Sequence, residues 1–132
     1  MNQVEKIFAL KRHPLFSPLE DAELILIADV AVSRQFAPGT TVAEPGALLN
    51  RIYIVTGGAI VDSRDASLTL PLVGVESLVL EKPVAQTLIA HPDDGAACLV
   101  IGKGHFFTIL NECPEILIHY LEGTRRRHRA IS

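Results

Sequence analysis

The spacing of apolar residues predicts a short helix at the start of the chain. Apolar residues recur there at Val4, Ile7, Phe8 and Leu10, which is the spacing of one helix face. Because a residue that precedes proline is disfavoured in the helical conformation, this helix should break at His13-Pro14.

A second helix signal follows at Ser17-Pro18-Leu19-Glu20. Ser17 can act as the N-cap, proline is favoured at the first helical position, and Glu20 occupies the acidic position of a capping box. We therefore expect a helix from this point to about Ala31. Its buried stripe should consist of Leu19, Leu24, Ile27 and Ala31.

From Ser33 onward the pattern changes to short apolar runs that glycine and proline separate. The expected strands cover residues 40–42, 52–55, 59–61, 68–73, 87–90 and 97–101. Such strands, spaced at roughly eight to twelve residues with turn residues between them, are typical of a β-sandwich or barrel. The end of the chain returns to helical character, over residues 105–110 and again over residues 114–122.

This order of elements predicts a mainly β fold with flanking helices. At 132 residues the chain has the length of one domain. We divide it into N-terminal helices over residues 1–32, a β-barrel over residues 33–103, and C-terminal helices with a basic tail over residues 104–132.

The charge of the chain is concentrated at its end. The formal net charge is −3, but Arg125, Arg126, Arg127 and Arg129 lie within the last eight residues. Without them, 8 basic residues face 15 acidic ones. A body with this excess of negative charge repels phosphates, so we expect that this domain alone does not bind nucleic acid. We expect the basic tail to be solvated.

No residue pattern indicates an enzyme, a metal site or a membrane protein. Cys98 and Cys113 lack metal-type spacing, and no secretory signal precedes them, so we expect reduced thiols in a cytoplasmic protein. Apolar runs are too short to span a bilayer. The paired histidines of a metal-binding cupin are missing between Gly39 and Tyr53, and neither a G-x-S-x-G motif nor another nucleophile motif occurs. We therefore expect no catalysis and no cofactor.

Residues 74–87 are the stretch on which the interpretation depends. They predict a turn, one short helical run and a second turn between two strand-like segments. A glycine before a short helix, with small residues after a proline, can leave backbone N–H groups converging on an anion. The geometry suggests a phosphate cradle, but Val84 stands where an arginine would serve, and Lys82 is the one positive charge nearby.

Motifs along the whole chain resemble those of the cyclic nucleotide-binding domain family, which includes the catabolite activator protein and the regulatory subunits of protein kinase A. The resemblance implies a jelly-roll barrel, a double-stranded β-helix, with helices at both ends. The matching residues are His13-Pro14-Leu15-Phe16-Ser17, Phe36-Ala37-Pro38-Gly39, Glu44-Pro45-Gly46, Tyr53-Ile54-Val55 with Gly58, Gly74, Pro83 with Ala85 and Thr87, and Leu99-Val100-Ile101 ahead of Phe106 and Leu110.

In that family the central stretch is the phosphate-binding cassette, whose usual form is F-G-E-L-A-L and then, after a few residues, P-R-x-A-T. The resemblance places Val75 at the ribose-binding glutamate and Val84 at the phosphate-binding arginine. Both polar anchors are then absent, and backbone N–H groups near Gly74, Val84 and Ala85 are the donors that remain. The candidate ligand-binding residues are Gly74, Val75, Glu76, Ser77, Pro83, Val84, Ala85 and Thr87.

Two functional hypotheses follow. The first is a regulatory or interaction domain that binds cAMP or cGMP weakly or not at all and acts by protein contact. The second is a genuine receptor for a cyclic nucleotide or another anion, which would use Glu76, Lys82 and backbone donors to control transcription or another output.

The last helix is the expected contact surface, because in the family it often mediates dimerisation. Its apolar stripe consists of Ile116, Leu117, Tyr120 and Leu121. This stripe can pack on the barrel or join a partner protein or a second copy of the chain.

Overall fold

The computed structural model describes residues 1–116 and 118, and it divides the chain into two compact units. Unit 1 combines residues 1–30 with the residues from 104 onward, and unit 2 is residues 31–103. Each unit is described by itself below. The assignment of the whole chain to one domain stays a prediction.

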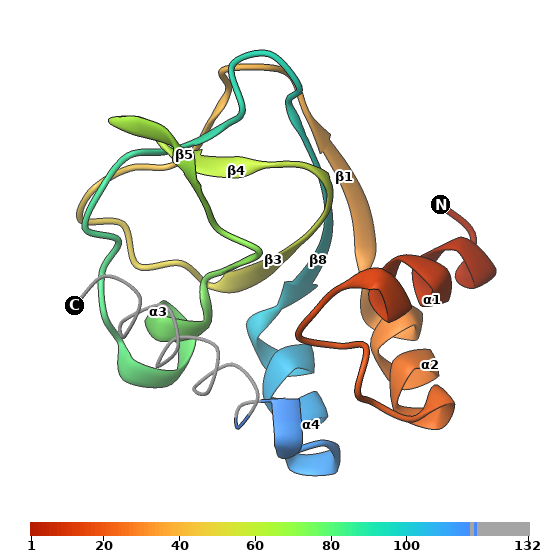
Figure 1. Ribbon diagram of the computed structural model, residues 1–132. Helices are drawn as coiled ribbons and strands as arrows, with labels where there is room; N and C mark the ends of the chain where they lie inside the picture. The colour runs from red at the N-terminus through yellow and green to blue at the C-terminus, as the bar shows by residue number, and fades with distance from the viewer. Residues whose placement is uncertain (117, 119–132) are drawn as a thin grey trace. The chain divides into compact units, whose positions relative to one another are not determined.

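Unit 1 is helical. Its helices are α1 (Gln3–Arg12), α2 (Asp21–Val30) and α4 (Lys103–Glu112), whose first residue belongs to unit 2 (Figure 1). The structure confirms the first predicted helix and its end at His13. A capping box that the sequence analysis missed begins α1: the Asn2 side chain accepts the Glu5 N–H at 2.8 Å, and the Asn2 N–H donates to Glu5 Oε1 at 3.3 Å.

Two polar contacts hold α1 and α2 side by side. Gln3 Nε2 donates to Asp29 Oδ1 at 2.7 Å, and Lys11 Nζ lies 3.0 Å from Asp21 Oδ1. The first contact joins the start of α1 to the end of α2, and the second joins the end of α1 to the start of α2. The two helices are therefore antiparallel.

The predicted start of the second helix was wrong. Ser17 lies in a turn rather than at an N-cap, because its N–H donates to the carbonyl oxygen of His13 at 2.9 Å. The helix begins at Asp21 instead, and the Glu20 N–H donates to Glu23 Oε1 at 3.1 Å. The predicted buried stripe is confirmed, since Leu19, Leu24, Ile27 and Ala31 are all buried.

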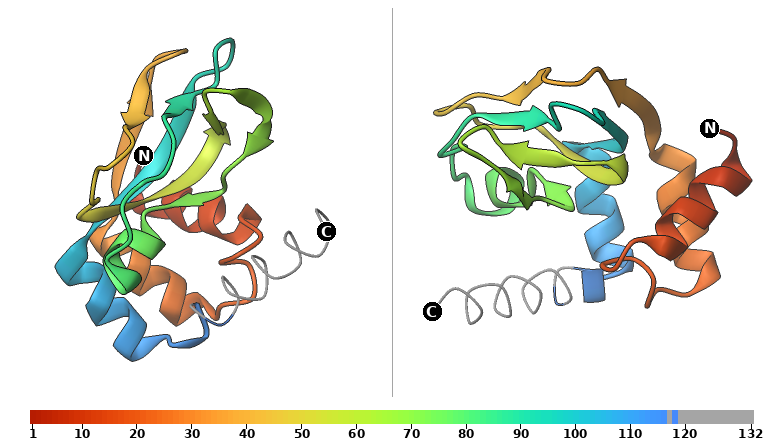
Figure 2. Two further views of the ribbon diagram at one scale, coloured as in Figure 1. Left: turned by 90° about the vertical axis from the view of Figure 1, so that its left-hand side faces the viewer. Right: turned by 45° about the horizontal axis from the view of Figure 1, so that its top comes forward.

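Unit 2 consists of two four-stranded sheets and one short helix. The first sheet has the order β1-β8-β3-β6 and the second the order β2-β7-β4-β5, with every pair antiparallel. Figure 2 shows these strands wrapping into a barrel from two further directions. The elements are β1 (Val32–Phe36), β2 (Thr41–Ala43), β3 (Arg51–Gly58), β4 (Ile60–Asp62), β5 (Asp65–Thr69), β6 (Leu72–Val73), α3 (Val75–Leu80), β7 (Leu88–Ala90) and β8 (Ala96–Gly102).

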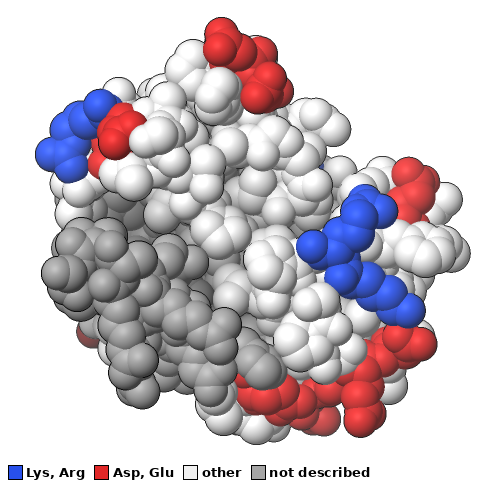
Figure 3. Space-filling view, viewed as in Figure 1, with Lys and Arg blue, Asp and Glu red and all other residues white. Residues whose placement is uncertain are grey.

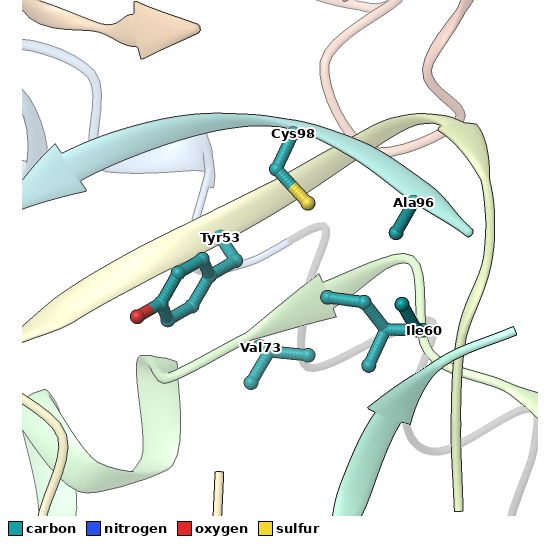
Figure 4. Close-up of a cluster of buried hydrophobic side chains, with 6 residues drawn as sticks. Tyr53, Ile60, Val73, Ala96 and Cys98 are labelled. Carbon is teal, nitrogen blue, oxygen red and sulfur yellow. The ribbon is translucent and has the colours of Figure 1, made fainter. Parts of the chain in front are cut away.

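The core of unit 2 lies between the two sheets. Buried side chains from β3, β6 and β8 of the first sheet face those from β4 and β7 of the second (Figure 4). This cluster consists of Tyr53, Ile60, Val73, Ala90, Ala96 and Cys98. Side chains from both sheets pack together in this space, and the observed architecture confirms the predicted mainly β fold with flanking helices.

Two features of the strands differ from the prediction. β1 was not predicted, because four of its five residues are exposed and show no alternation of apolar and polar positions. The single strand expected over residues 68–73 is two strands in different sheets. The Leu70 N–H donates to the carbonyl oxygen of Ile60 in the second sheet, whereas the next carbonyl, that of Pro71, accepts the Val55 N–H of the first sheet. The chain therefore changes sheet between Leu70 and Pro71.

The outer strands of the second sheet are β2 and β5, and all five residues of β5 are exposed. Both the N–H and the Oγ of Ser67 donate to Oδ1 of Asp65, at 3.0 and 2.6 Å. A side chain of the strand itself thus occupies one backbone donor of this edge.

The helix predicted over residues 114–122 lies mostly outside the described residues. Ile116 is buried and Ile118 is exposed. The other members of its predicted apolar stripe, Leu117, Tyr120 and Leu121, lie outside the residues that the structure describes. Within residues 1–116 and 118, each helix is too short or too polar to cross a membrane.

Close backbone contact makes Gly58 sensitive to substitution. Gly58 has a φ of +59°, and a Cβ atom there would overlap the carbonyl oxygen of Gly95. We expect Gly58→Ala to lower the free energy of unfolding by about 1–3 kcal/mol or more, measured by urea denaturation. The adjacent Gly57→Ala is the matched control, since its Cβ would meet Ala97 at an ordinary 3.5 Å. Equal stability of the two variants would contradict this expectation.

The two cysteines should be unreactive in the folded protein. Burial raises the pKa of Cys98 to about 12, and burial is also the main cause that raises the pKa of Cys113 to about 12. Because the thiolate is the reactive form, a thiol reagent at pH 8 should modify neither residue until urea unfolds the chain. Modification of the native protein at the rate of a free thiol would contradict this.

The raised pKa of Cys98 also predicts how the stability of the protein changes at alkaline pH. The pKa of the Cys98 thiol is higher in the folded chain than its value near 9 in the unfolded chain. As the pH rises, the unfolded chain therefore loses the thiol proton first. The contribution of Cys98 to the free energy of unfolding should therefore fall above about pH 9. Cys98→Ala should remove this part of the pH dependence in denaturation curves, and an unchanged dependence would contradict the assignment.

Candidate functional site

The candidate cassette begins at Gly74, between β6 and α3. Gly74 has a φ of +108°, and a Cβ atom there would overlap the carbonyl oxygen of Arg51 in β3. Only glycine combines this left-handed conformation with so close an approach of two backbones. The glycine thus places the start of α3 directly against the longest strand of the barrel.

The α3 helix turns two of its candidate residues inward and one outward. Val75 and Ser77 are buried with 4% and 5% of their surface exposed, whereas Glu76 is exposed. The side chain of Val75 is therefore shielded from solvent. An aliphatic group at this position offers no hydrogen bond to a ribose hydroxyl.

A tight turn ends α3. Glu81 adopts a left-handed conformation with a φ of +53°, and the N–H groups of Glu81 and Lys82 both donate to the carbonyl oxygen of Glu76. The Ser77 hydroxyl donates to the Lys82 carbonyl at 2.8 Å. Ser77 thus stabilises this turn, and the Lys82 side chain is exposed.

Backbone hydrogen bonds tie Val84 to the loop between β2 and β3. The Val84 N–H donates to the Ala47 carbonyl at 2.8 Å, and the Gly46 N–H donates to the Val84 carbonyl at 2.7 Å. One of the backbone donors expected near a bound anion is therefore already engaged within the protein. Pro83 and Ala85 on either side are exposed, and Val84 itself is half-buried.

Thr87 marks the end of the cassette. It is half-buried, and its carbonyl accepts the Ser63 N–H at 2.9 Å, just before β7 begins at Leu88. The structure thus brings Ser77 to the turn at Lys82 and places Val84 against the β2–β3 loop. Whether the eight candidate residues form one ligand site stays a prediction.

Sequence reasoning missed the two residues that hold Val84. Gly46 and Ala47 lie almost forty positions from Val84 in the chain. The turn at Glu44-Pro45-Gly46 was recognised, and Gly46 does have a φ of +87°. The turn residues themselves gave no indication that this loop would form backbone hydrogen bonds with Val84.

Among residues 1–116 and 118, no three histidine, cysteine or acidic side chains gather closely enough to hold a metal ion. The most conspicuous carboxylate, Asp62, is paired with Arg64 of the same turn, and this hydrogen bond lowers the pKa of Asp62.

Comparison with known proteins shows similarity in structure rather than in sequence. No family model and no curated protein matches the chain. Among solved structures, the regulatory domain of Toxoplasma gondii PKA with cAMP is 19% identical, with a TM-score of 0.73 over 92% of this chain. The chain spans 50% of the length of that domain.

Two further structures match over nearly their whole length. A PKAR CBD2 bound to Sp-2Cl-cAMPS is 18% identical, with a TM-score of 0.73 over 99% of this chain and 94% of the other. The N-terminal domain of a transcriptional regulator from Streptomyces coelicolor is 25% identical, with a TM-score of 0.61 over 93% of this chain and 92% of the other. The order of the strands, the glycine turn before α3 and these similarities lead to one conclusion: the chain has the fold of the cyclic nucleotide-binding domains.

Proposed function

We propose that the chain is a non-catalytic regulatory domain whose cassette binds cAMP or cGMP weakly or not at all, and which acts by contact with a protein. Regulatory domains of this fold are its structural neighbours, and they include a PKA regulatory domain with cAMP and a transcriptional regulator. The proposed contact is made through the last helix or the vacated cassette, with a partner protein or a second copy of the chain.

The state of Val84 is the observation that carries this proposal. Its side chain is aliphatic, and its N–H and carbonyl both bond to the β2–β3 loop. A cyclic phosphate would therefore find no guanidinium and one fewer backbone donor at this position. A charge-assisted hydrogen bond is worth on the order of 1.5–3 kcal/mol, so its loss alone weakens binding by roughly tenfold to a hundredfold.

The burial of Val75 supports the same proposal. A glutamate at this position would have to reach a ribose hydroxyl, whereas the valine is apolar and only 4% exposed. Glu76, the adjacent carboxylate, is exposed on another side of α3. At these two positions the short helix thus has a buried valine followed by an exposed glutamate.

Titration calorimetry with cAMP, cGMP and cyclic dinucleotides tests the proposal directly. We expect no heat of binding at micromolar concentrations of any of these ligands, because both polar anchors are replaced by valine. Micromolar or tighter binding of any one of them would overturn the proposal. That result would instead support a small-ligand receptor that uses Glu76, Lys82 and backbone donors.

An arginine in place of Val84 should restore part of the affinity for cAMP. We expect Val84→Arg to strengthen cAMP binding by roughly tenfold to a hundredfold over the unmodified chain, because a guanidinium can pair with the phosphate. Ala85→Arg is the matched control, since it adds the same charge at the adjacent exposed position. A folded Val84→Arg variant that binds no better than Ala85→Arg would show that this turn is not a phosphate site.

A further inference from the structure

The turn between β7 and β8 contains a titratable group in an unusual bonding role. His91 precedes Pro92, Asp93, Asp94 and Gly95, which lead into β8. The N–H groups of Asp93 and Asp94 both donate to Nδ1 of His91, at 3.1 and 3.3 Å. A nitrogen that accepts hydrogen bonds carries no proton, so in this conformation the ring is neutral and its hydrogen is on Nε2.

This turn lies where the chain passes from one sheet to the other. The His91 N–H donates to the Ala59 carbonyl, the Ala59 N–H donates to the Gly95 carbonyl, and the Gly39 N–H donates to the Ala90 carbonyl. Three crossings between the sheets therefore meet here, formed by residues 36–41, 58–60 and 90–96. Figure 1 shows this end of unit 2 at the top of the view, opposite α3.

Among residues 1–116 and 118, the charged partner that the structure gives His91 belongs to its own turn. The segments bonded to the turn, residues 36–41 and 57–60, contain no titratable side chain, and β7 contains none either. Asp94 Oδ2 lies 3.7 Å from His91 Nδ1, and the side chains of His91 and Asp94 are 24% and 71% exposed. Figure 3 shows acidic side chains gathered at the top of the view, where this turn lies.

We propose that the turn over residues 91–95 is a proton-operated switch, closed around neutral His91 and opened when Nδ1 takes up a proton. Protonation converts Nδ1 from an acceptor into a donor, so the N–H groups of Asp93 and Asp94 lose their common partner. The new N–H can then pair with the nearby carboxylate of Asp94.

Nuclear magnetic resonance of the full chain tests the switch. At pH 8 we expect the ring nitrogen shifts of His91 to show an unprotonated Nδ1 and a protonated Nε2. As the pH falls, the amide protons of Asp93 and Asp94 should shift with the midpoint of the His91 ring. Their protection factors against exchange should fall by roughly twofold to tenfold. The amide of Ala90, which donates to the Thr40 carbonyl, is the internal control and should keep its protection.

Two variants separate the roles of the ring and the carboxylate. His91→Asn replaces the ring with a side-chain carbonyl that accepts a nearby N–H in the same kind of turn and does not titrate, so the turn should persist and its pH response should vanish. Asp94→Asn removes the carboxylate that would pair with the charged ring. In that variant the amides should still respond to pH, because the ring still exchanges an acceptor for a donor.

Either of two results in the unmodified chain would overturn the proposal. One is a ring whose Nδ1 carries the proton at pH 8. The other is a pair of Asp93 and Asp94 amides whose shifts and protection stay constant while the His91 ring titrates.

Discussion

The pairing of β3 with β8 is the interaction on which unit 2 depends. These are its two longest strands, and their register runs from Arg51 opposite Gly102 to Gly58 opposite Ala96. β1 pairs with the far side of β8 and β6 with the far side of β3, so the first sheet is built outward from this pair. The two close backbone contacts also depend on it, because Gly74 approaches Arg51 at one end of β3 and Gly58 approaches Gly95 at the other.

Much of the fold could be predicted because its strongest signals are local. Proline after His13 ended α1 as expected, and the apolar spacing of α2 identified its buried stripe. The errors arise from contacts that the pattern of apolar and polar residues does not reveal. Ser17 carried every local property of an N-cap, yet a bond to His13 placed it in a turn, and β1 is a strand because it pairs with β8 rather than because of its own residues.

The same distinction applies to the candidate site. The glycine turn and the short helix were recognisable from residues 74–80, since both depend on local conformation. The bonds between Val84 and the β2–β3 loop could not be predicted, because they join segments far apart in sequence. The replacement of two polar anchors by valine was visible from the residues alone, but the burial of Val75 and the engagement of the Val84 N–H required the fold.

The exposed outer strand β5 has a feature that opposes pairing with a strand of another molecule. An unpaired strand edge can recruit a strand from another molecule and so begin aggregation. In β5 the Asp65 carboxylate already holds the N–H of Ser67, and it places a negative charge beside that backbone donor. A strand that paired with this N–H would have to displace the carboxylate from it, which disfavours sheet growth at this position.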